Sequence, residues 1–303
     1  MIPNTSLMSK YELGDGKNLK NPFKTFCIIG DPVNHSLSPL IHNSAFASSN
    51  LNYSYIAFRV PQSELGESIS SLKKINTAGF NVTLPHKVNI IDFLDGLSNE
   101  AKKAGAVNTV NNENGKFIGY NTDIFGFIAP LEKRQIGFKN MEILIMGAGG
   151  SCRAALVGLS KKKDDIKKIN IVNRDQKKLE TVIQLGNDLG LNCNALGYDN
   201  GSILKETSLN SGLIINTTSI GLNNEASPLK SNFMNKNSFV YDIIYRPVYT
   251  DLLKNAKEAG SSIIFGYEML LHQAIRSFEI WTGTIAPVHV MTKALFGIFG
   301  EPK

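Results

Sequence analysis

Residues 143–155 read ILIMGAGGSCRAA, an apolar run that leads through a glycine cluster into a helical pattern. This order predicts a β-strand, a tight turn and the first turn of a helix. Gly147 permits the turn, and Gly149 lets a pyrophosphate approach the amides of the helix N-terminus. Cys152 stands where the third glycine of such fingerprints is usual, and Gly150 directly follows Gly149. Glycines also make ordinary turns, but the strand–turn–helix setting favours a dinucleotide site.

The next expected strand, at 168–172, ends in Asn173, Arg174 and Asp175. An acidic residue there binds a ribose 2′-hydroxyl, whereas an arginine accommodates a 2′-phosphate. Arg174 favours NADP because a guanidinium matches phosphate in charge and in geometry. Asp175 would repel that phosphate, so NAD use stays open. A solvated strand end with no ligand is the plainer interpretation of the same residues.

Short apolar runs alternate with helical patterns along the whole chain, which predicts an α/β fold with parallel sheets covered by helices. The expected strands lie at 26–30, 53–60, 79–84, 142–146, 168–172, 213–216, 239–243 and 262–265. The expected helices of the first part lie at 39–48, 63–75 and 88–94, and helical spacing returns from Tyr267 onward. Asn114-Gly115, between 106–110 and 117–120, predicts a hairpin.

The length of 303 residues favours two domains, at about 150 residues each. The net charge of +6 suits anionic small molecules as well as nucleic acid, so it decides neither. Asp164 and Asp165 separate the lysines at 161–163 from those at 167–168, which is typical of a solvated surface. We therefore expect a small-molecule substrate and no nucleic-acid partner.

The cysteines Cys27, Cys152 and Cys193 are three in number and form no CxxC pair, which disfavours disulfides and a cysteine-based zinc site. The five histidines form no spaced ligand cluster, so we expect no metal. No apolar run approaches the ~18 residues that span a bilayer. Residues 1–22 lack a signal-peptide core and are interpreted as a flexible extension. The composition thus predicts a cytoplasmic protein that binds no membrane.

Polar side chains gather where strands of the N-terminal half end. Ser36 and Ser38 point the same way in an extended segment and can grip one carboxylate, although Ser38-Pro39 also suits a helix cap. Asn81 and Thr83 share one face of their strand. Lys87 follows a proline turn, and a lone lysine is usually solvated. Asp123, after Asn121-Thr122, equally suits a helix N-cap.

The ordered set of motifs resembles the shikimate dehydrogenase family from about residue 26 to residue 300. The matching segments are 30–39 with His42-Asn43, 81–87, 105–109, 121–126, 147–154, Asn173-Arg174, 216–221, 242–253 and 266–281. Single motifs are modestly specific, but their common order is very specific. The resemblance implies the reversible, NADPH-dependent reduction of 3-dehydroshikimate to shikimate in aromatic amino-acid and chorismate biosynthesis.

The resemblance also implies roles for individual residues. Lys87 and Asp123 match the catalytic pair, which can move a proton at the reacting oxygen and stabilise an alkoxide. The substrate-binding matches are Ser36, Ser38, Asn81, Thr83, Asn108, Tyr245 and Gln273. The cofactor-binding set comprises Gly147, Ala148, Gly149, Gly150, Ser151, Asn173, Arg174, Asp175, Thr218, Ile243 and Gly266. His35 and His42 are interpreted as structural.

The resemblance implies two α/β domains that enclose a cleft. Residues 23–122 and 266–303 form the substrate-binding catalytic domain, and 123–265 form the Rossmann-type NADP-binding domain. The C-terminal helices therefore return to the first domain. The protein is expected to be a monomer or a homodimer.

Two departures from the family pattern keep alternatives open. Asp175 stands where a small hydroxyl residue is common in NADP-specific members, which allows a quinate/shikimate dehydrogenase that uses NAD. Asn99 stands where an acidic residue is frequent, with Glu100 beside it. A non-catalytic protein that senses redox state by binding nucleotide is a further alternative, but it would need neither Lys87 nor Asp123.

Overall fold

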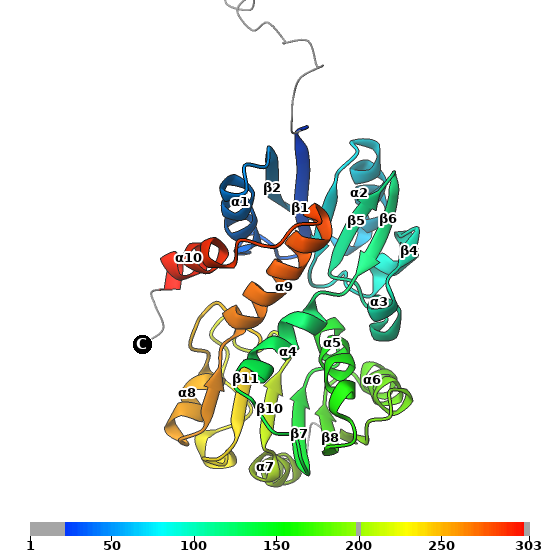
Figure 1. The fold of residues 1–303 in the computed structure, drawn as a ribbon. Coiled ribbons are helices and arrows are strands. Elements are labelled where there is room, and N and C mark those ends of the chain that lie inside the picture. The colour runs from blue at the N-terminus through cyan, green and yellow to red at the C-terminus, as the bar shows by residue number, and fades with distance from the viewer. Residues whose placement is uncertain (1–21, 198–200, 300–303) are drawn as a thin grey trace, which may run out of the picture.

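The computed structural model describes residues 22–197 and 201–299. These residues form two six-stranded sheets at opposite ends of an elongated molecule, with helix α9 running between them (Figure 1). The predicted α/β fold with two sheets is confirmed. Nearly all of the expected extension at 1–22 lies outside the described residues. No helix in the described ranges is long and apolar enough to cross a membrane.

The first sheet has the strand order β2-β1-β3-β5-β6-β4. Its strands are β1 (Lys24–Gly30), β2 (Tyr53–Arg59), β3 (Gly79–Val82), β4 (Gly96–Leu97), β5 (Thr109–Glu113) and β6 (Lys116–Tyr120). The expected parallel pairing holds for β2, β1 and β3, whereas β5 runs antiparallel to both β3 and β6. Asn114 and Gly115 both have positive φ, which confirms the predicted hairpin turn.

Helices cover both faces of this sheet. They are α1 (Ser38–Ser48), α2 (Leu65–Lys74), α3 (Asn99–Ala104) and, from the other end of the chain, α9 (Gly266–Thr282) and α10 (Val288–Phe299). The helix predicted at 88–94 is instead a 3₁₀ helix, η3 (Asn89–Phe93), in which Ile90 is buried. A single buried position gives such a short segment little packing to extend it into an α-helix. A second 3₁₀ turn, η2 (Gln62–Glu64), precedes α2.

The second sheet is parallel throughout, with the order β12-β11-β10-β7-β8-β9. Its strands are β7 (Met141–Met146), β8 (Ile166–Val172), β9 (Cys193–Leu196), β10 (Leu213–Asn216), β11 (Phe239–Asp242) and β12 (Ser262–Ile264). Strand β9 was not predicted from the sequence, because it is an edge strand in which only Cys193 is buried. The strand order reverses between β7 and β10, and open α/β sheets bind their ligands at such a point.

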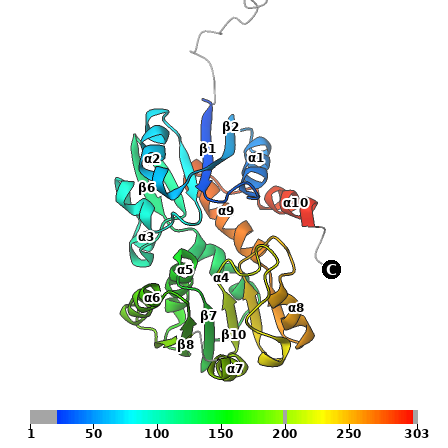
Figure 2. The same ribbon diagram turned by 180° about the vertical axis from the view of Figure 1, so that it is seen from behind.

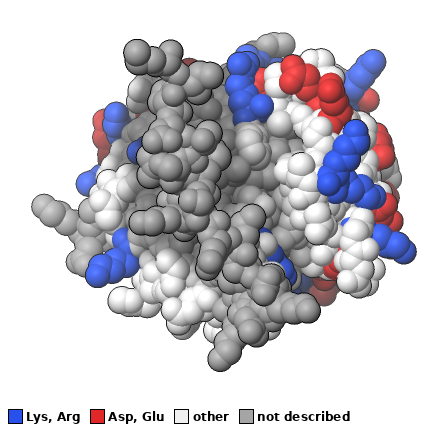
Figure 3. Space-filling model, turned by 90° about the horizontal axis from the view of Figure 1, so that it is seen from above, with Lys and Arg blue, Asp and Glu red and all other residues white. Residues whose placement is uncertain are grey.

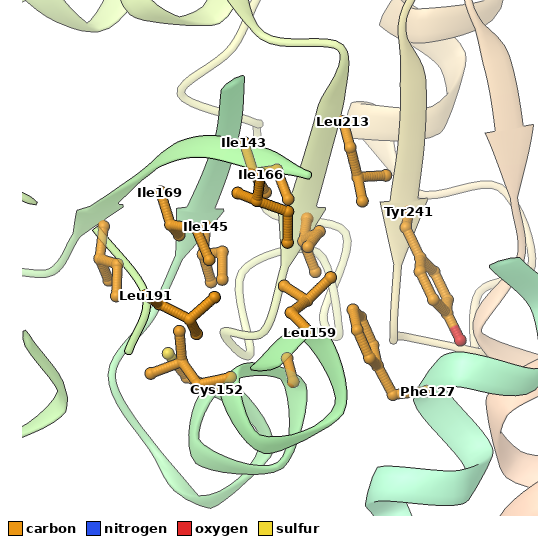
Figure 4. Close-up of a cluster of buried hydrophobic side chains, with 14 of the residues drawn as sticks. Phe127, Ile143, Ile145, Cys152, Leu159, Ile166, Ile169, Leu191, Leu213 and Tyr241 are labelled. Carbon is orange, nitrogen blue, oxygen red and sulfur yellow. The ribbon is translucent and has the colours of Figure 1, made fainter. Parts of the chain in front are cut away.

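The helices of this half are α4 (Asp123–Lys133), α5 (Gly150–Leu159), α6 (Gln176–Asp188), α7 (Gly201–Asn210) and α8 (Asp251–Glu258), with 3₁₀ turns η4 (Ser160–Lys162) and η5 (Ser231–Phe233). The core between α4, α5 and the sheet is apolar (Figure 4). In it the rings of Phe127 and Tyr241 stack at a centroid distance of 5.3 Å. Because β7 is buried almost completely, its apolar run ILIM fixes the middle of the sheet.

Helix α9 belongs to the packing of both halves (Figures 1 and 2). Met269, in its first turn, packs into the core of the second sheet, whereas Leu271 and Phe278 pack with α1 and α10. Arg134 at the end of α4 makes a two-point ion pair with Glu268, at 2.7 and 2.8 Å. The chain thus crosses between the halves twice, before α4 and before α9. The ion pair joins these two helices.

The surface at the end that carries the first sheet shows no single-sign field on its described part (Figure 3). Lysine and arginine side chains alternate there with aspartate and glutamate side chains. The net charge of +6 is therefore not gathered on this part of the face.

Helices α4 and α9 approach so closely that Gly126 has no room for a side chain. A Cβ at this position would lie 2.8 Å from the Cβ of Gln273 and 2.8 Å from the carbonyl oxygen of Met269. Neither neighbour is the free end of a flexible side chain. We expect Gly126→Ala to separate the helices and lower the free energy of unfolding by about 1–3 kcal/mol, measured by urea denaturation.

Gly137→Ala is the matched control, because nothing lies within 4 Å of a Cβ at that exposed position. We expect its unfolding midpoint to equal or slightly exceed that of the wild type, since alanine restricts the unfolded chain. Equal effects of the two substitutions would contradict the close approach of α4 and α9.

Candidate active site

A cavity of about 640 Å³ opens between the two halves of the molecule. The first half contributes the ends of β1 and β3, and the second contributes the glycine turn after β7 and the loops after β10 and β11. Helix α9 adds Met269, Leu270 and Gln273. The cavity therefore lies at the carboxyl ends of parallel strands in both sheets, where the strand order of the second sheet reverses.

Lys87 and Asp123 form an ion pair in this cavity. The Lys87 Nζ donates to the Asp123 Oδ2 at 2.6 Å, and the two side chains are only 18% and 6% exposed. Lys87 is not the solvated lysine that its sequence context allowed. Asp123 is not an N-cap either, because Thr122 precedes the helix and makes no side-chain cap bond. Asp123 is the first residue of α4, and its carboxylate is free to pair with Lys87 because it does not cap the helix.

Gly150 brings the lysine and the glycine turn together. A Cβ on Gly150 would lie 2.9 Å from the Cβ of Lys87. The glycine that departs from the usual fingerprint spacing therefore makes room for Lys87. The Lys87 Nζ also lies 3.5 Å from the hydroxyl of Ser151, in the first turn of α5. Substrate-side and cofactor-side elements thus meet at one side chain.

Asn108 orients the aspartate. Its amide nitrogen donates to the Asp123 Oδ1 at 3.0 Å, to the Thr122 hydroxyl at 2.8 Å and to Gln273 Oε1 at 3.3 Å. Its oxygen accepts the backbone N–H of Thr122 at 2.7 Å. Because the side chain of Asn108 is buried, these bonds fix both ends of its amide and hold Asp123 toward Lys87.

Ser36, Ser38 and Tyr245 also line the cavity. The Ser36 hydroxyl accepts from the backbone N–H of Ser38 at 3.3 Å. Burial raises the pKa of Tyr245, and the neighbouring Ser36 and Leu37 oppose that rise. Both serines line the cavity, so one turn presents two hydroxyls and a neighbouring phenol to it. This donor set is suited to a carboxylate.

The structure brings all nine predicted catalytic and substrate-binding residues to the cavity wall. They are Ser36, Ser38, Asn81, Thr83, Lys87, Asn108, Asp123, Tyr245 and Gln273. Hydroxyls, amides, a cation and a carboxylate therefore converge in one space. Such a set matches a small acid that carries several hydroxyl groups.

The predicted cofactor residues divide into two groups. Those that line the cavity are Ala148, Gly149, Gly150, Ser151, Thr218, Ile243 and Gly266. Gly147 lies behind them, with φ +107° and a Cβ position only 2.6 Å from the Thr217 hydroxyl, as a turn glycine requires. Gly149 precedes α5 without any side-chain cap, and a Cβ there would meet open space. The uncapped amides of α5 therefore fit an anionic dinucleotide.

Asn173, Arg174 and Asp175 follow β8 and do not line the cavity. Asp175 caps α6 by accepting the backbone N–H of Lys178 at 3.1 Å, and the two side chains form an ion pair at 3.5 Å. These bonds to Lys178 hold the pKa of Asp175 below its usual value. The carboxylate is therefore directed toward its own helix.

Sequence reasoning missed three basic residues of the cavity wall, Arg153, Lys178 and Arg246. Arg153 projects from α5 and donates to the carbonyl oxygen of Ala104 at 3.3 Å. Lys178 follows Asp175 by three residues, a spacing that places both in the first turn of one helix. That spacing was the available signal for Lys178. Asn99, the second departure, begins α3 and lies outside the cavity wall.

Comparisons with known proteins agree with this geometry. The family model for the shikimate dehydrogenase substrate binding domain matches residues 28–110, and that for the shikimate 5′-dehydrogenase C-terminal domain matches 266–296. The NADP(+) shikimate dehydrogenase of Nitrosopumilus maritimus is 49% identical over 276 residues, covering 91% of this chain and 99% of the relative.

The chain belongs to the shikimate dehydrogenase family.

Two solved structures of family members share its fold. Shikimate dehydrogenase from Aquifex aeolicus is 35% identical, with a TM-score of 0.80 over 92% of this chain and 98% of that one. The enzyme from Thermus thermophilus, solved with NADP(H) and shikimate, is 31% identical, with a TM-score of 0.77 over 90% and 98% of the two chains. The family predicted from the motifs is confirmed.

His42 is placed as a structural residue, as the family pattern suggested. It is fully buried, stacks on Tyr55 at 4.7 Å and lies 5.0 Å from the ring of Trp281. Burial lowers its pKa to about 3, so the ring is neutral and acts as an aromatic. His35, in contrast, lines the cavity.

Asp242 joins the two loops on the cofactor side. Its carboxylate accepts from the Thr250 hydroxyl at 2.6 Å, from the Ile244 N–H at 3.0 Å and from the Asn216 amide at 3.0 Å. Asn216 in turn accepts the N–H and hydroxyl of Thr218. One buried carboxylate thereby positions the loops after β10 and β11.

Burial raises the pKa of Asp242 to about 6, from its usual value of about 3.9. Between these values the folded protein binds more protons than the unfolded chain, so stability falls as pH rises through this window. We expect the free energy of unfolding of the wild type, relative to Asp242→Asn, to fall by on the order of 2 kcal/mol between about pH 4 and pH 6.5. Urea denaturation of both proteins at several pH values measures this difference, and a difference independent of pH would contradict the assignment.

Proposed function

We propose that this chain catalyses the reversible reduction of 3-dehydroshikimate to shikimate with NADPH, a step of aromatic amino-acid biosynthesis. One observation carries the proposal. The Lys87–Asp123 pair, at 2.6 Å, lies between a wall of hydroxyl and amide groups and the uncapped glycine turn before α5. A polyhydroxylated acid and a dinucleotide can therefore meet at the pair.

NADPH, when bound, supplies the hydride for the carbonyl carbon. The Lys87 ammonium has three protons, of which one is directed to Asp123 and one toward Ser151. The remaining proton can be donated to the oxygen of the carbonyl as negative charge develops there. In the reverse direction neutral Lys87 accepts the hydroxyl proton. Asp123 keeps the ammonium in place in both directions.

The far side of the cavity orients the ring. Ser36 and Ser38 supply hydroxyl donors for the substrate carboxylate, and Tyr245 stands beside them. Thr83, Asn108 and Gln273 line the cavity from the residue after β3, the loop before β5 and α9, where they can contact the ring. A carboxylate anchored at one side and a reacting oxygen at the other define a single orientation.

The same residues support a division of the chain into domains. We infer that 23–122 and 266–303 form the substrate-binding catalytic domain and that 123–265 form the cofactor-binding domain. The packing of α9 and α10 on α1 supports this division. With two crossings between the halves, closure of the cavity would bring the nicotinamide ring to the substrate.

Removal of the lysine amine tests the proposed chemistry. We expect Lys87→Met to lower kcat for shikimate oxidation by about 10³-fold, since a positioned general acid–base contributes 10²–10⁴-fold. The measurement is NADPH formation at saturating shikimate and NADP. Lys74→Met is the control, because Lys74 is an exposed lysine on α2 outside the cavity wall. Full activity of the Lys87 variant would exclude its proposed role.

The NADP preference is proposed to rest on Lys178 together with Arg174. Lys178 lines the cavity and compensates the charge of Asp175. We expect Lys178→Ala to raise KM for NADP about tenfold and to leave KM for NAD within twofold, because only NADP carries the 2′-phosphate. Steady-state kinetics with both cofactors provides the measurement.

Two further variants sharpen this experiment. Lys177→Ala removes an equally exposed neighbouring lysine that does not line the cavity, and its kinetics should match the wild type. Asp175→Ser keeps a residue that can cap α6 but removes the carboxylate, so KM for NADP should fall. Equal effects of Lys177→Ala and Lys178→Ala would refute the specific role of Lys178.

A further inference from the structure

Three buried hydroxyl groups lie behind the cavity and do not line it. They belong to Thr109 on β5, Thr122 before α4 and Ser277 on α9. The Ser277 Oγ is 2.8 Å from the Thr109 Oγ1 and 3.1 Å from the Thr122 Oγ1. Thr109 and Ser277 are fully buried, and Thr122 is 2% exposed. Three distant parts of the sequence thus meet at one polar point.

Ser277 has more polar contacts than a helical serine requires. Its hydroxyl donates to the carbonyl oxygen of Gln273, four residues earlier, at 3.0 Å. That bond alone satisfies many serines inside helices. Ser277 also accepts from the Asn81 amide at 3.2 Å and contacts both threonines. It is the point through which α9 is tied to β3, β5 and the start of α4.

From Ser277 the hydrogen bonds extend in two directions, to Asp123 and to Asn81. On one side, Thr122 accepts from Asn108, and Asn108 donates to the carboxylate of Asp123. On the other, the Asn81 Oδ1 accepts from the Tyr55 hydroxyl at 2.6 Å, and Asn81 itself lines the cavity. The catalytic aspartate and the substrate-side amide of Asn81 are therefore connected through buried groups.

The amides in this network have fewer protons than nearby acceptors. The Asn108 amide has two N–H groups for Thr122, Asp123 and Gln273. The Asn81 amide has two for the carbonyl oxygen of Asn108, Thr109 and Ser277. Which acceptors receive a proton from Asn81 and Asn108 therefore depends on how the hydroxyl groups of Thr109, Thr122 and Ser277 are oriented. If one hydroxyl is removed, both amides can rotate and bond with other acceptors.

We propose that Ser277 is a positioning residue, which holds Asn108 and Asp123 on one side and Asn81 on the other in the geometry that shikimate oxidation requires. This role rests on the proposed function. It acts through Thr122, Thr109 and Asn81, because Ser277 itself does not touch the cavity. In the described part of the chain, the network meets the nucleotide side of the cavity through Lys87 alone, which bonds with both Asp123 and Ser151.

Ser277→Ala tests the role. We expect kcat/KM for shikimate to fall about tenfold, within the roughly hundredfold loss that a misplacement of about 1 Å can cause. KM for NADP should stay within twofold of the wild type. The pH profile of kcat should shift, because Asp123 loses part of its fixed hydrogen bonding. A merely structural role would leave that profile unchanged.

Thr282→Ala is the matched control on the same helix. Thr282 makes the same kind of bond, from its hydroxyl to the carbonyl oxygen of Phe278 at 2.8 Å, but outside the network. Its kinetics should match the wild type. If both variants lose activity equally, or if Ser277→Ala keeps wild-type kcat/KM and pH profile, the positioning role is wrong. A wild-type enzyme inactive on shikimate would instead overturn the proposed function itself.

A second pair of variants separates the hydroxyl from side-chain size. Ser277→Thr and Ser277→Val add similar volume, but only threonine keeps the hydroxyl. We expect the threonine variant to have at least fivefold higher kcat/KM than the valine variant, about 1 kcal/mol by the usual conversion. Equal activities of these two variants, each corrected for folded protein by its urea unfolding curve, would contradict the role of the hydroxyl.

Discussion

The ion pair between Lys87 and Asp123 depends on the closest contacts between the two halves of the molecule. Asp123 begins α4, and α4 can approach α9 only because residue 126 lacks a side chain. Lys87 in turn packs directly on Gly150, at the start of α5. Two glycines therefore bring the Lys87–Asp123 pair, the polar wall of the cavity and the glycine turn after β7 within reach of one another. A shift of α4 or α5 would move the Lys87–Asp123 pair away from the other groups that line the cavity.

Polar groups around the pair are held by a buried network rather than by solvent. Asn108 uses both ends of its amide, and the hydroxyls behind it connect the aspartate through Ser277 to Asn81. Such a network is costly unless every member is bonded, and bonded networks impose one geometry. Stereospecific hydride transfer to a polyhydroxylated ring needs such a geometry. The apolar clusters on either side pack against the elements that carry it.

Much of the site was predictable from sequence because its residues stand in short motifs at strand ends. Parallel strands bring their carboxyl ends together within one sheet, which favours a site near Asn81 and Lys87. The turn after Met146 belongs to the other sheet, and only the family resemblance implied that it lies at the same cleft. The function of Gly150 was not predictable, because it depends on Lys87, sixty-odd residues away in the chain. Ser277 lies within a matching segment but is not one of its motif residues, and Lys178 had only its spacing from Asp175 as a signal, so the roles proposed for both come from tertiary contacts. Asp175 appeared to oppose NADP until its bonds to Lys178 placed it as a cap of α6.

Initial rates on shikimate and on quinate, each measured with NADP and with NAD, test most directly the central claim that this cavity is built for shikimate and NADP. Ser36 and Ser38, Lys87 and Lys178 all line this cavity, where we propose that they bind the carboxylate, the reacting oxygen and the 2′-phosphate. We therefore expect the highest kcat/KM for shikimate with NADP and at least tenfold lower values for the other combinations. Quinate oxidation with NAD at a kcat/KM equal to or above that of shikimate with NADP would contradict it.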